Sequence, residues 1–314
     1  MLQLMLHSHP RIAIPPETRF VLTAYEMRRS FGDLSDPERR RALGRWIIDR
    51  PGTKFADLGL DPAATLDDIT AAPGTLGSAL AMVFQAYATR FGKPRWGDKR
   101  PAYLQNLDVI LRLFPTAQIV NIVRDGRDCV ASLNEMPWHR DDLHTTVAAW
   151  ARAVDDARRA ARALRRDQWH ELRYEDLVAD PATELTRLCA FLGEDYDPVM
   201  ASPARVAPVA VPANKKWHRR THDPVTTQRV GSWQTRLTEA EIALCEAALG
   251  SRLTACGYEL SAVPHPPRRE LLRYSITAMP HRLAPAKRRL IRVAIRLRRE
   301  PEVAYPSAPL IGPG

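Results

Sequence analysis

The sequence predicts an α/β fold in which helices flank a parallel β-sheet. Two observations predict it. Segments with a helical spacing of apolar residues alternate with short β-like runs, and strands separated by helices form parallel sheets. The run Gln-Ile-Val-Asn-Ile-Val at 118–123 is mostly apolar and β-branched, and a turn follows it at once. Such a run is typical of a buried parallel strand.

The remaining elements follow from the same periodicities. Helical spacing predicts helices over 18–31, 37–48, 75–91, 103–113, 143–164, 182–192 and 238–249. The β-like runs predict strands over 11–14, 118–123 and 169–173. The sequence contains no internal repeat, so the order of these elements defines the architecture.

Composition indicates a folded chain. Of the 314 residues, 45% are hydrophobic and 26% are charged, which is enough apolar content for a large core and excludes a disordered chain. No apolar run approaches the ~20 residues of a membrane-spanning helix, and the apolar stretch at 1–6 is too short for a signal peptide. The four cysteines are far apart and form no CxxC pair, so we expect no metal site, no disulfide framework and a cytoplasmic location.

The positive charge is concentrated at the C-terminal end. Basic residues exceed acidic residues by ten in the whole chain, 46 against 36, and residues 261–314 alone contain eleven basic and three acidic residues. The first 260 residues therefore carry about +2, and no nucleic-acid partner is expected. We expect an α/β domain over 1–260 and, after a Pro-rich joint at 264–267, a basic helical tail over 261–314.

The tail has the pattern of a basic amphipathic helix. Its predicted apolar face carries Leu290, Ile291, Ala294 and Leu297, and its opposite face carries Arg288, Arg292, Arg296 and Arg299. Such a helix suits an anionic membrane surface, an acidic partner, or docking onto the protein's own body. A cytoplasmic protein held peripherally at a membrane is one consequence.

A strand-turn-helix segment at 119–133 places an arginine where α/β folds bind ligands. The predicted strand ends just before Arg124, and an Asp-Gly turn precedes the next helix. Ligands of open α/β sheets bind outside the carboxyl ends of strands, so Arg124 is placed to bind an anion such as a phosphate. Ser132, about two helical turns further on, adds a hydroxyl if its face points the same way. The alternative for Arg124 is an ion pair with Asp125 or Asp128.

Two earlier segments place charged side chains at turns before helices. Lys99 follows Trp-Gly-Asp at a strand-to-helix turn, where an anionic ligand would sit; the alternative is a surface lysine beside Asp98. Glu17 lies in the first turn of a helix that two prolines introduce. A carboxylate there often only complements the helix dipole. It serves as a general base if it faces the same cleft as Lys99 and Arg124.

Taken together, these segments resemble the sulfotransferase superfamily, which transfers a sulfuryl group from 3′-phosphoadenosine 5′-phosphosulfate (PAPS). The similarity is greatest to bacterial sulfotransferase-like and tyrosylprotein sulfotransferase members, and it runs in order from residue 7 to about residue 260. The matching segments are His-Ser-His-Pro…Pro-Glu-Thr-Arg at 7–19, Asp98-Lys99 with Phe114-Pro115, Val-Arg-Asp-Gly-Arg…Ser at 123–132, Arg-Tyr-Glu-Asp-Leu at 173–177, and Gly-Ser-Trp at 231–233 with Cys-Gly-Tyr at 256–258. Each segment is weak alone, and their common order makes the set fairly specific.

The resemblance implies a role for each candidate residue. Glu17 would accept the proton of the acceptor, and Lys99 would neutralise charge on the bridging oxygen of the leaving group. Arg124 and Ser132 would bind the 3′-phosphate of PAPS, and Tyr174 would lie against its adenine. A transferring sulfuryl group carries less negative charge than a phosphoryl group, so no magnesium ion is required.

The chain departs from the family's pattern at its beginning. Members have an N-terminal strand and a Gly-rich loop that hold the 5′-phosphosulfate, whereas this sequence opens inside the helix that follows them. We therefore expect a P-loop-NTPase-like parallel sheet with its first strand and phosphate loop missing. Two explanations are open: the true start lies upstream of Met1, or the N-terminally truncated chain is genuine and is unstable, inactive or a binding-only relative.

Three functions remain open, and we favour the first. The first is a PAPS-dependent sulfotransferase acting on a hydroxyl or amine of an acceptor that no motif identifies. Similarity to the tyrosylprotein members makes Arg19 a candidate contact for that acceptor. The second is a non-catalytic relative that binds the nucleotide. The third is an adaptor that binds a membrane or an acidic partner through the tail.

Overall fold

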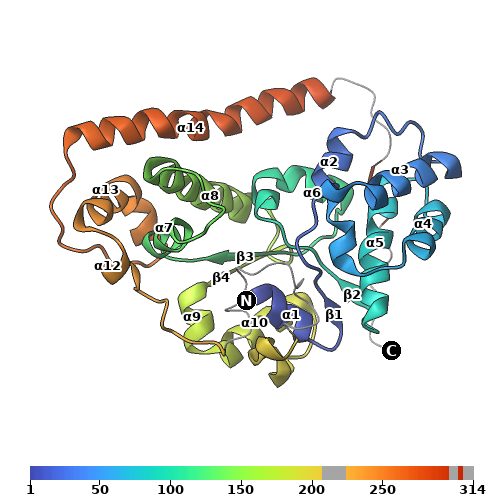
Figure 1. The fold of residues 1–314 in the computed structure, drawn as a ribbon, viewed down its shortest axis with the longest axis horizontal. Helices are drawn as coiled ribbons and strands as arrows, with labels where there is room; N and C mark the ends of the chain where they lie inside the picture. Colours follow the sequence, from blue (N-terminus) through green and yellow to red (C-terminus); the bar gives the residue numbers. More distant parts are fainter. Residues whose placement is uncertain (207–223, 297–302, 307–314) are drawn as a thin grey trace. The chain divides into compact units, whose positions relative to one another are not determined.

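The structure is a computed structural model in which residues 1–206, 224–296 and 303–306 are described (Figure 1). The chain divides into two compact units. The first consists of Met1–Gln118, Leu185–Val225 and Pro301–Gly314, and the second of Ile119–Glu184 and Thr226–Glu300. Each unit contains one pair of parallel strands. Over the described ranges, no helix has the length and apolar character needed to cross a bilayer.

The first unit is mainly helical. Its helices are α1 (Leu2–Ser8), α2 (Phe20–Glu26), α3 (Pro37–Asp49), α4 (Pro62–Ala71), α5 (Leu76–Arg90) and α6 (Leu107–Leu113). Short 3-10 turns occupy Pro51–Thr53, Phe55–Leu58, Pro101–Asn106, Pro198–Ala201 and Pro203–Arg205. Strands β1 (Ile12–Ala13) and β2 (Arg95–Trp96) pair in parallel. Helix α10 (Pro181–Leu192) begins in the second unit and ends in the first.

The core of the first unit forms around α5. Ten of the fifteen residues of this helix are buried, so it is covered on nearly every side. Phe84 of α5 stacks against Phe20 of α2 and Trp96 of β2, with ring centres 5.3 and 5.0 Å apart. Aromatic contacts of this kind stabilise a core beyond the area that they bury. The stack fixes the helix that follows Glu17 against the strand that precedes Lys99.

The second unit is built on strands β3 (Ile119–Val123) and β4 (Trp169–Arg173). They pair in parallel along their whole length, from Ile119 opposite Trp169 to Val123 opposite Arg173. The helices of this unit are α7 (Gly126–Asn134), α8 (Leu143–Ala163), α9 (Tyr174–Ala179), α12 (Trp233–Arg236), α13 (Glu239–Ala255) and α14 (Arg268–Arg296). Helix α8 packs against α7, α13 and α14, and these helices form the core of the unit.

The alternation of helices and parallel strands predicted from the sequence is confirmed, with shifted ends. Helix α2 stops at Glu26, well short of residue 31, because Arg28 curls back and donates to the carbonyl of Tyr25 at 2.8 Å. Helix α13 continues beyond 249 because Leu253 stays in the core; Gly257, with φ at +79°, turns the chain after it. Helices α4 and α9 and strand β2 were not among the predicted elements.

Strand β3 is less buried than the sequence predicts. Most of its side chains are half-buried, and Ile122 is 39% exposed. The reason is that β3 pairs with β4 along one edge, and no further strand pairs with it within residues 1–206, 224–296 and 303–306. The apolar run therefore predicted the position of the strand correctly, whereas its prediction that the strand is buried was wrong.

The predicted tail helix corresponds to α14, which starts at Arg268 and packs along α8 (Figure 1). Tyr274 and Ala278 of α14 are buried in the core of the second unit. The face predicted to carry Leu290, Ile291, Ala294 and Leu297 lies mostly outside the described side chains; Leu290 is exposed.

A buried arginine joins three segments of the second unit. Arg127 of α7 donates to Asp125 at 2.7 Å, to Glu246 of α13, and to the carbonyl of Glu259 at 2.8 Å. Its guanidinium carbon lies 3.9 Å from the ring centre of Trp233. Its side chain and both carboxylates are more than 90% buried. Arg127 is therefore the buried counter-ion that neutralises both carboxylates, Asp125 and Glu246.

Replacing Arg127 should strongly destabilise the second unit. Arg127→Met keeps much of the side-chain volume but leaves two buried carboxylates without their cation, so we expect a loss of about 3–5 kcal/mol of unfolding free energy. Urea denaturation followed by circular dichroism measures it. The matched control is Arg165→Met, which breaks an exposed pair with Asp167 and should leave stability near wild type. Equal stability of the two variants would contradict the assignment.

Candidate functional site

In the first unit, the parallel strands β1 and β2 bring Glu17 next to Lys99. Adjacent parallel strands end at the same edge, so the loops that follow them leave side by side. The carboxylate Oε2 of Glu17 lies 3.7 Å from Nζ of Lys99, and the two side chains are 28% and 46% exposed. Lys99 thus pairs with Glu17. The sequence alternatives were a surface lysine beside Asp98 and a carboxylate that only complements the helix dipole, and neither of them includes this pair. An acid and a cation share one accessible position.

Asp98 lies behind this pair and joins its two loops. Its Oδ2 accepts hydrogen bonds from the hydroxyl of Thr18 at 2.7 Å and from the hydroxyl of Tyr103. Thr18 is fully buried, so the neighbour of Glu17 is tied to the neighbour of Lys99. Oδ1 is shielded from solvent and has no partner in the described part of the chain. Burial raises the pKa of Asp98 to about 6, despite these hydrogen bonds and the nearby charge of Lys99.

A cavity of about 480 Å³ lies beside Arg19, which follows Glu17 by two residues. Arg19, Thr23, Trp46, Arg50 and the turn 51–53 line it. Nε of Arg19 lies 3.4 Å from Oε1 of Glu17, which connects the cavity to the acid-cation pair. With two guanidinium groups and an indole in its wall, this cavity (the Arg19 cavity) has both positive charge and an apolar surface.

In the second unit, strand pairing brings Arg124 to Tyr174. Val123 and Arg173 are the last paired residues of β3 and β4, so the next residue of each strand emerges at the same edge. The guanidinium carbon of Arg124 lies 4.4 Å from the ring centre of Tyr174, within the range of a cation-π contact. Burial raises the pKa of the Tyr174 phenol, and the positive charge of Arg124 opposes this. The two residues form one basic, aromatic surface.

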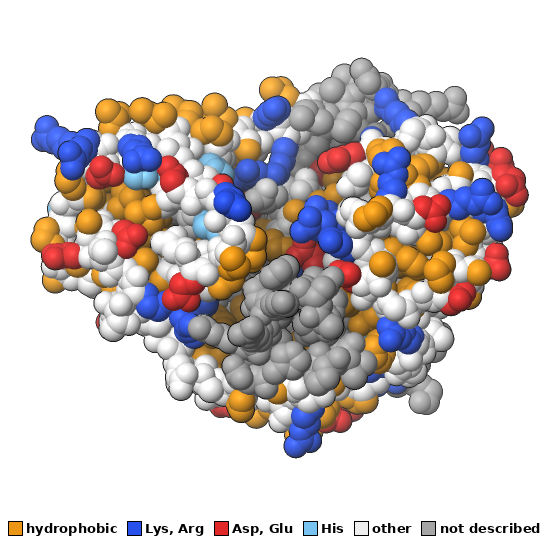
Figure 2. Space-filling view, viewed as in Figure 1, with side chains coloured by type: hydrophobic (Ala, Val, Ile, Leu, Met, Phe, Trp, Pro, Cys, Tyr) orange, Lys and Arg blue, Asp and Glu red, His pale blue; other side chains and the backbone are white. Residues whose placement is uncertain are grey.

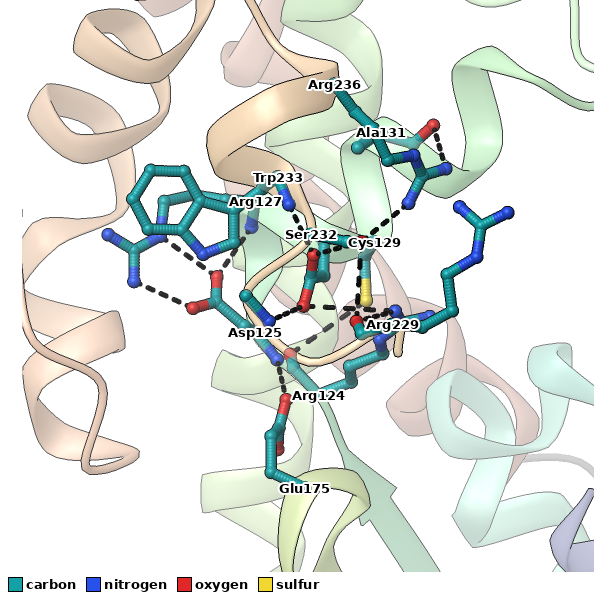
Figure 3. A network of polar contacts seen from close by, with 12 residues as sticks. Arg124, Asp125, Arg127, Cys129, Ala131, Glu175, Arg229, Ser232, Trp233 and Arg236 are labelled. Atoms are coloured by element: carbon teal, nitrogen blue, oxygen red, sulfur yellow. Dashed lines mark hydrogen bonds and ion pairs between the residues drawn. The ribbon is translucent and has the colours of Figure 1, made fainter. Parts of the chain in front are cut away.

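A buried carboxylate fixes a third segment beside Arg124 (Figure 3). Asp128 of α7 is fully buried and accepts hydrogen bonds from the backbone of Gly231 and Trp233 at 2.9 and 2.8 Å and from the Ser232 hydroxyl at 3.0 Å. Nη2 of Arg124 donates to the carbonyl of Arg229 at 2.7 Å. The segment 229–233 is therefore bound to both α7 and Arg124.

The turn between β3 and α7 is braced from two sides. The backbone N–H of Asp125 donates to Glu175 of α9 at 3.0 Å, and Trp150 of α8 donates to the carbonyl of Arg124 at 3.1 Å. Gly126 is required at the turn because a Cβ there would lie 2.9 Å from the Trp150 ring. The predicted pairing of Arg124 with acidic neighbours is present only in part: Asp128 lies 3.9 Å away, and Asp125 binds Arg127.

Sequence reasoning did not identify Arg229, and it named Asp98 and Asp128 only as neighbours of Lys99 and Arg124, not as the carboxylates that hold these loops. The Arg229 guanidinium is 27% exposed and lies 3.6 Å from Glu135. Its signal was its place two residues before the Gly-Ser-Trp segment. Asp98 and Asp128 had no such signal, because their partners lie 80 and more than 100 residues away in the chain.

The predicted site residues fall into two groups. Glu17 and Lys99 lie together in the first unit, and Arg124 and Tyr174 lie together in the second. Ser132 is half-buried and lies four residues after Asp128, on the same face of α7. The structure thus places Glu17 beside Lys99 and Arg124 beside Tyr174, while the single cleft expected for Glu17, Lys99 and Arg124 and the roles of the residues remain predictions.

Comparison with protein families gives a match over most of the chain. A model described as Sulfotransferase family matches residues 1–198. The protein-tyrosine sulfotransferase of Drosophila melanogaster is 21% identical over 277 residues, which cover 84% of this chain and 50% of that protein. The nodulation protein NoeE of Sinorhizobium fredii is 27% identical over 281 residues, which cover 82% of this chain and 62% of that protein. The chain spans less than two thirds of either relative.

Two solved structures share the fold. One is the sulfotransferase domain of the Synechococcus PCC 7002 olefin synthase, with a TM-score of 0.57 and 20% identity over 83% of this chain and 90% of that one. The other is the sulfotransferase domain from the curacin biosynthetic pathway, with a TM-score of 0.56 and 16% identity over 83% of this chain and 93% of that one. The predicted α/β fold is confirmed.

Because the pKa of Asp98 is raised, the free energy of unfolding should fall as pH rises from about 4 to above 6. The pKa of an aspartate is normally 3.8 and burial raises it here to about 6, so between these values the folded protein retains a proton that the unfolded chain has lost. Its contribution is complete below about pH 4 and is lost as pH rises through 6. Relative to Asp98→Asn, wild type should lose about 3 kcal/mol of unfolding free energy between about pH 4 and pH 7.

Urea denaturation at a series of pH values measures this difference. Asp68→Asn, an exposed substitution on α4, is the control and should keep the wild-type pH profile. A constant stability difference between wild type and Asp98→Asn over the whole range would show that Asp98 does not titrate as stated.

Proposed function

Because this chain belongs to the sulfotransferase family, we propose that it transfers a sulfuryl group from PAPS to a hydroxyl or amine of an acceptor. The observation that carries the proposal is the accessible pair of Glu17 and Lys99, 3.7 Å apart on loops at the carboxyl ends of β1 and β2. A base and a cation side by side suit a reaction in which a proton leaves one atom while negative charge builds on another.

The proposed reaction uses these two groups in sequence. The acceptor oxygen or nitrogen attacks sulfur, and Glu17 takes the proton that it loses. The bond between sulfur and the bridging oxygen breaks, and its electron pair leaves with adenosine 3′,5′-bisphosphate. Lys99 neutralises the charge that develops on that oxygen. Asp98 does not take part in this step; its hydrogen bond to Thr18 holds the two loops at a fixed separation.

The surface around Arg124 fits the 3′-phosphoadenosine part of the donor. Arg124 lies at the carboxyl end of β3, and its positive charge and guanidinium geometry suit the 3′-phosphate. The Tyr174 ring beside it offers a flat face for the adenine. Ser132 would add a hydroxyl, and the Arg229 guanidinium would add a second positive charge to the phosphate.

The acceptor would enter through the Arg19 cavity. Arg19 contacts the carboxylate of Glu17 and also lines the cavity, so a group bound there would lie near the proposed base. A volume of about 480 Å³ accommodates a small molecule or a single side chain. This placement agrees with the expectation from sequence that Arg19 contacts the acceptor.

The 3′-phosphate should control nucleotide affinity through Arg124. Wild type should bind adenosine 3′,5′-bisphosphate at least about tenfold more tightly than adenosine 5′-monophosphate, because hydrogen bonds to charged groups contribute roughly 1.5–3 kcal/mol. Arg124→Met should lower that preference several-fold, as measured by isothermal titration calorimetry. Arg165→Met, an exposed arginine of the same unit, should preserve it. Equal affinity of wild type for both nucleotides would contradict the proposed phosphate site.

Transfer should depend on Glu17 and Lys99, with nucleotide binding preserved. Loss of a general base lowers kcat by about 100-fold or more, which we expect for Glu17→Gln with radiolabelled PAPS and a panel of acceptors. Lys99→Met should lower kcat comparably, because the leaving oxygen loses its counter-charge. Glu38→Gln, an exposed change on α3, is the matched control.

The outcomes separate catalysis from binding. Undiminished turnover in Glu17→Gln would remove that residue from the role of base. If wild type binds the bisphosphate but transfers no sulfate to any acceptor, the chain is a nucleotide-binding relative and the proposed transfer is wrong.

A further inference from the structure

Helix α14 presents apolar side chains on two opposite sides. Its inner side carries Tyr274 and Ala278, which are buried in the core that this helix shares with α8 and α13. Polar contacts to the α8 region hold the same helix: Glu270 lies 3.0 Å from His144, and Arg273 lies 3.1 Å from Asp142. These contacts account for the apolar residues on the inner side of α14, which are packed. They do not account for the apolar residues on its outer side.

The outer side carries a continuous stripe of large apolar residues. Leu272, Ile276, Met279, Leu283 and Leu290 are between 52% and 72% exposed. Their spacing of four, three, four and seven residues keeps them within one narrow face of a helix with 3.6 residues per turn. By the same periodicity this face lies nearly opposite the buried inner side. We call these five residues the outer stripe; it extends about 27 Å along the helix at 1.5 Å per residue.

Hydrophobic side chains also reach the surface in the region of α14. Figure 2 shows hydrophobic side chains along the upper edge of the molecule, where Figure 1 places α14. A surface helix with one packed side normally has polar residues on the other. Five large apolar side chains at one periodicity are therefore a distinct feature, because single exposed apolar residues occur at scattered positions on ordinary surfaces.

Cations accompany the stripe. The sequence of α14 contains nine arginines and lysines and one acidic residue, Glu270, which lies 3.0 Å from His144. The exposed cations are Arg268, Arg269, Arg273, Arg282 and Lys287. Several of them lie at helical positions beside the stripe. Their aliphatic stems extend the apolar surface, and their charged ends reach outward to anions.

We propose that α14 binds an anionic lipid surface through its outer stripe, lying in the plane of the headgroups. Charge complementarity selects this occupant: lipid phosphates match the arginines and lysines, while acyl chains receive the stripe. A second copy of the chain would bring two strongly positive helices together, which the like charges oppose. By helical periodicity the stripe lies on the side of α14 away from the residues that pack on α8. The proposal is independent of sulfuryl transfer.

The test is vesicle flotation of the full chain at low and high salt. Wild type should float with mixed phosphatidylcholine and phosphatidylglycerol vesicles, remain unbound with phosphatidylcholine alone, and be released by salt. The triple variant Leu272→Gln, Ile276→Gln and Leu283→Gln should bind at least about tenfold more weakly, because it removes buried apolar area. Circular dichroism and a urea midpoint confirm that the variant is folded.

A second variant changes charge and leaves the stripe intact. Arg268→Gln, Arg282→Gln and Lys287→Gln together should lower affinity at low salt by about tenfold or more, since each cation near an anionic surface contributes on the order of a fivefold change. The matched control is Leu260→Gln, a 46% exposed leucine outside α14, which should leave binding unchanged.

Each remaining outcome overturns the proposal. Wild-type binding in the stripe variant, or equal binding to neutral and anionic vesicles, would exclude an electrostatic, stripe-mediated contact. A self-associating protein whose dimer disappears in the stripe variant, without vesicle binding, would assign the stripe to a second copy. A monomer that binds no vesicles would exclude lipid and leave an acidic protein as the occupant.

Discussion

In-register pairing of parallel strands is the constraint on which both candidate groups depend. A parallel pair ends both strands at one edge, so the segments that follow the two strands leave the sheet side by side. In the second unit, Val123 opposite Arg173 sets Arg124 against Tyr174. In the first, β1 and β2 are only two residues long, and the hydrogen bond from Thr18 to Asp98 adds to their pairing in holding Glu17 near Lys99. A shift of one residue in the pairing of β3 and β4 would no longer place Arg124 opposite Tyr174.

Buried carboxylates then convert neighbouring loops into fixed ones. Asp128 accepts hydrogen bonds through both of its oxygens from the backbone and the hydroxyl of the segment 231–233. The guanidinium of Arg124 lies 3.9 Å from the same carboxylate. Asp98 holds its loops through side chains instead: one of its oxygens accepts hydrogen bonds from the hydroxyl groups of Thr18 and Tyr103. Burial is the dominant influence on Asp98 and raises its pKa. The same carboxylate orders the loop of Glu17 at some cost in stability.

Helix α14 shows how one element can serve two surfaces. Its inner side adds Tyr274 and Ala278 to the core, which fixes the helix along α8. Because the helix is fixed, its outer side is fixed as well, and five apolar side chains stay exposed to solvent. A free amphipathic helix would instead fold its apolar residues onto whichever surface was available. Rigid attachment therefore makes an apolar face on the outside persistent.

The sequence by itself determined the local features of this protein. Helix ends follow from side chains within three residues: Asp36, Thr75, Asp142 and Thr238 each cap the helix that follows. The strand-turn-helix around Arg124 and the sulfotransferase relationship also follow from short, ordered segments. Only the tertiary structure decided how exposed β3 and the outer stripe of α14 are. It also decided three long-range contacts: the hydrogen bond of Asp98 with Thr18, those of Asp128 with the segment 231–233, and the ion pair of Arg127 with Glu246. The reason is physical: capping and periodicity act over a few residues, whereas these contacts join groups some 80 to 120 residues apart that meet only after the chain has packed.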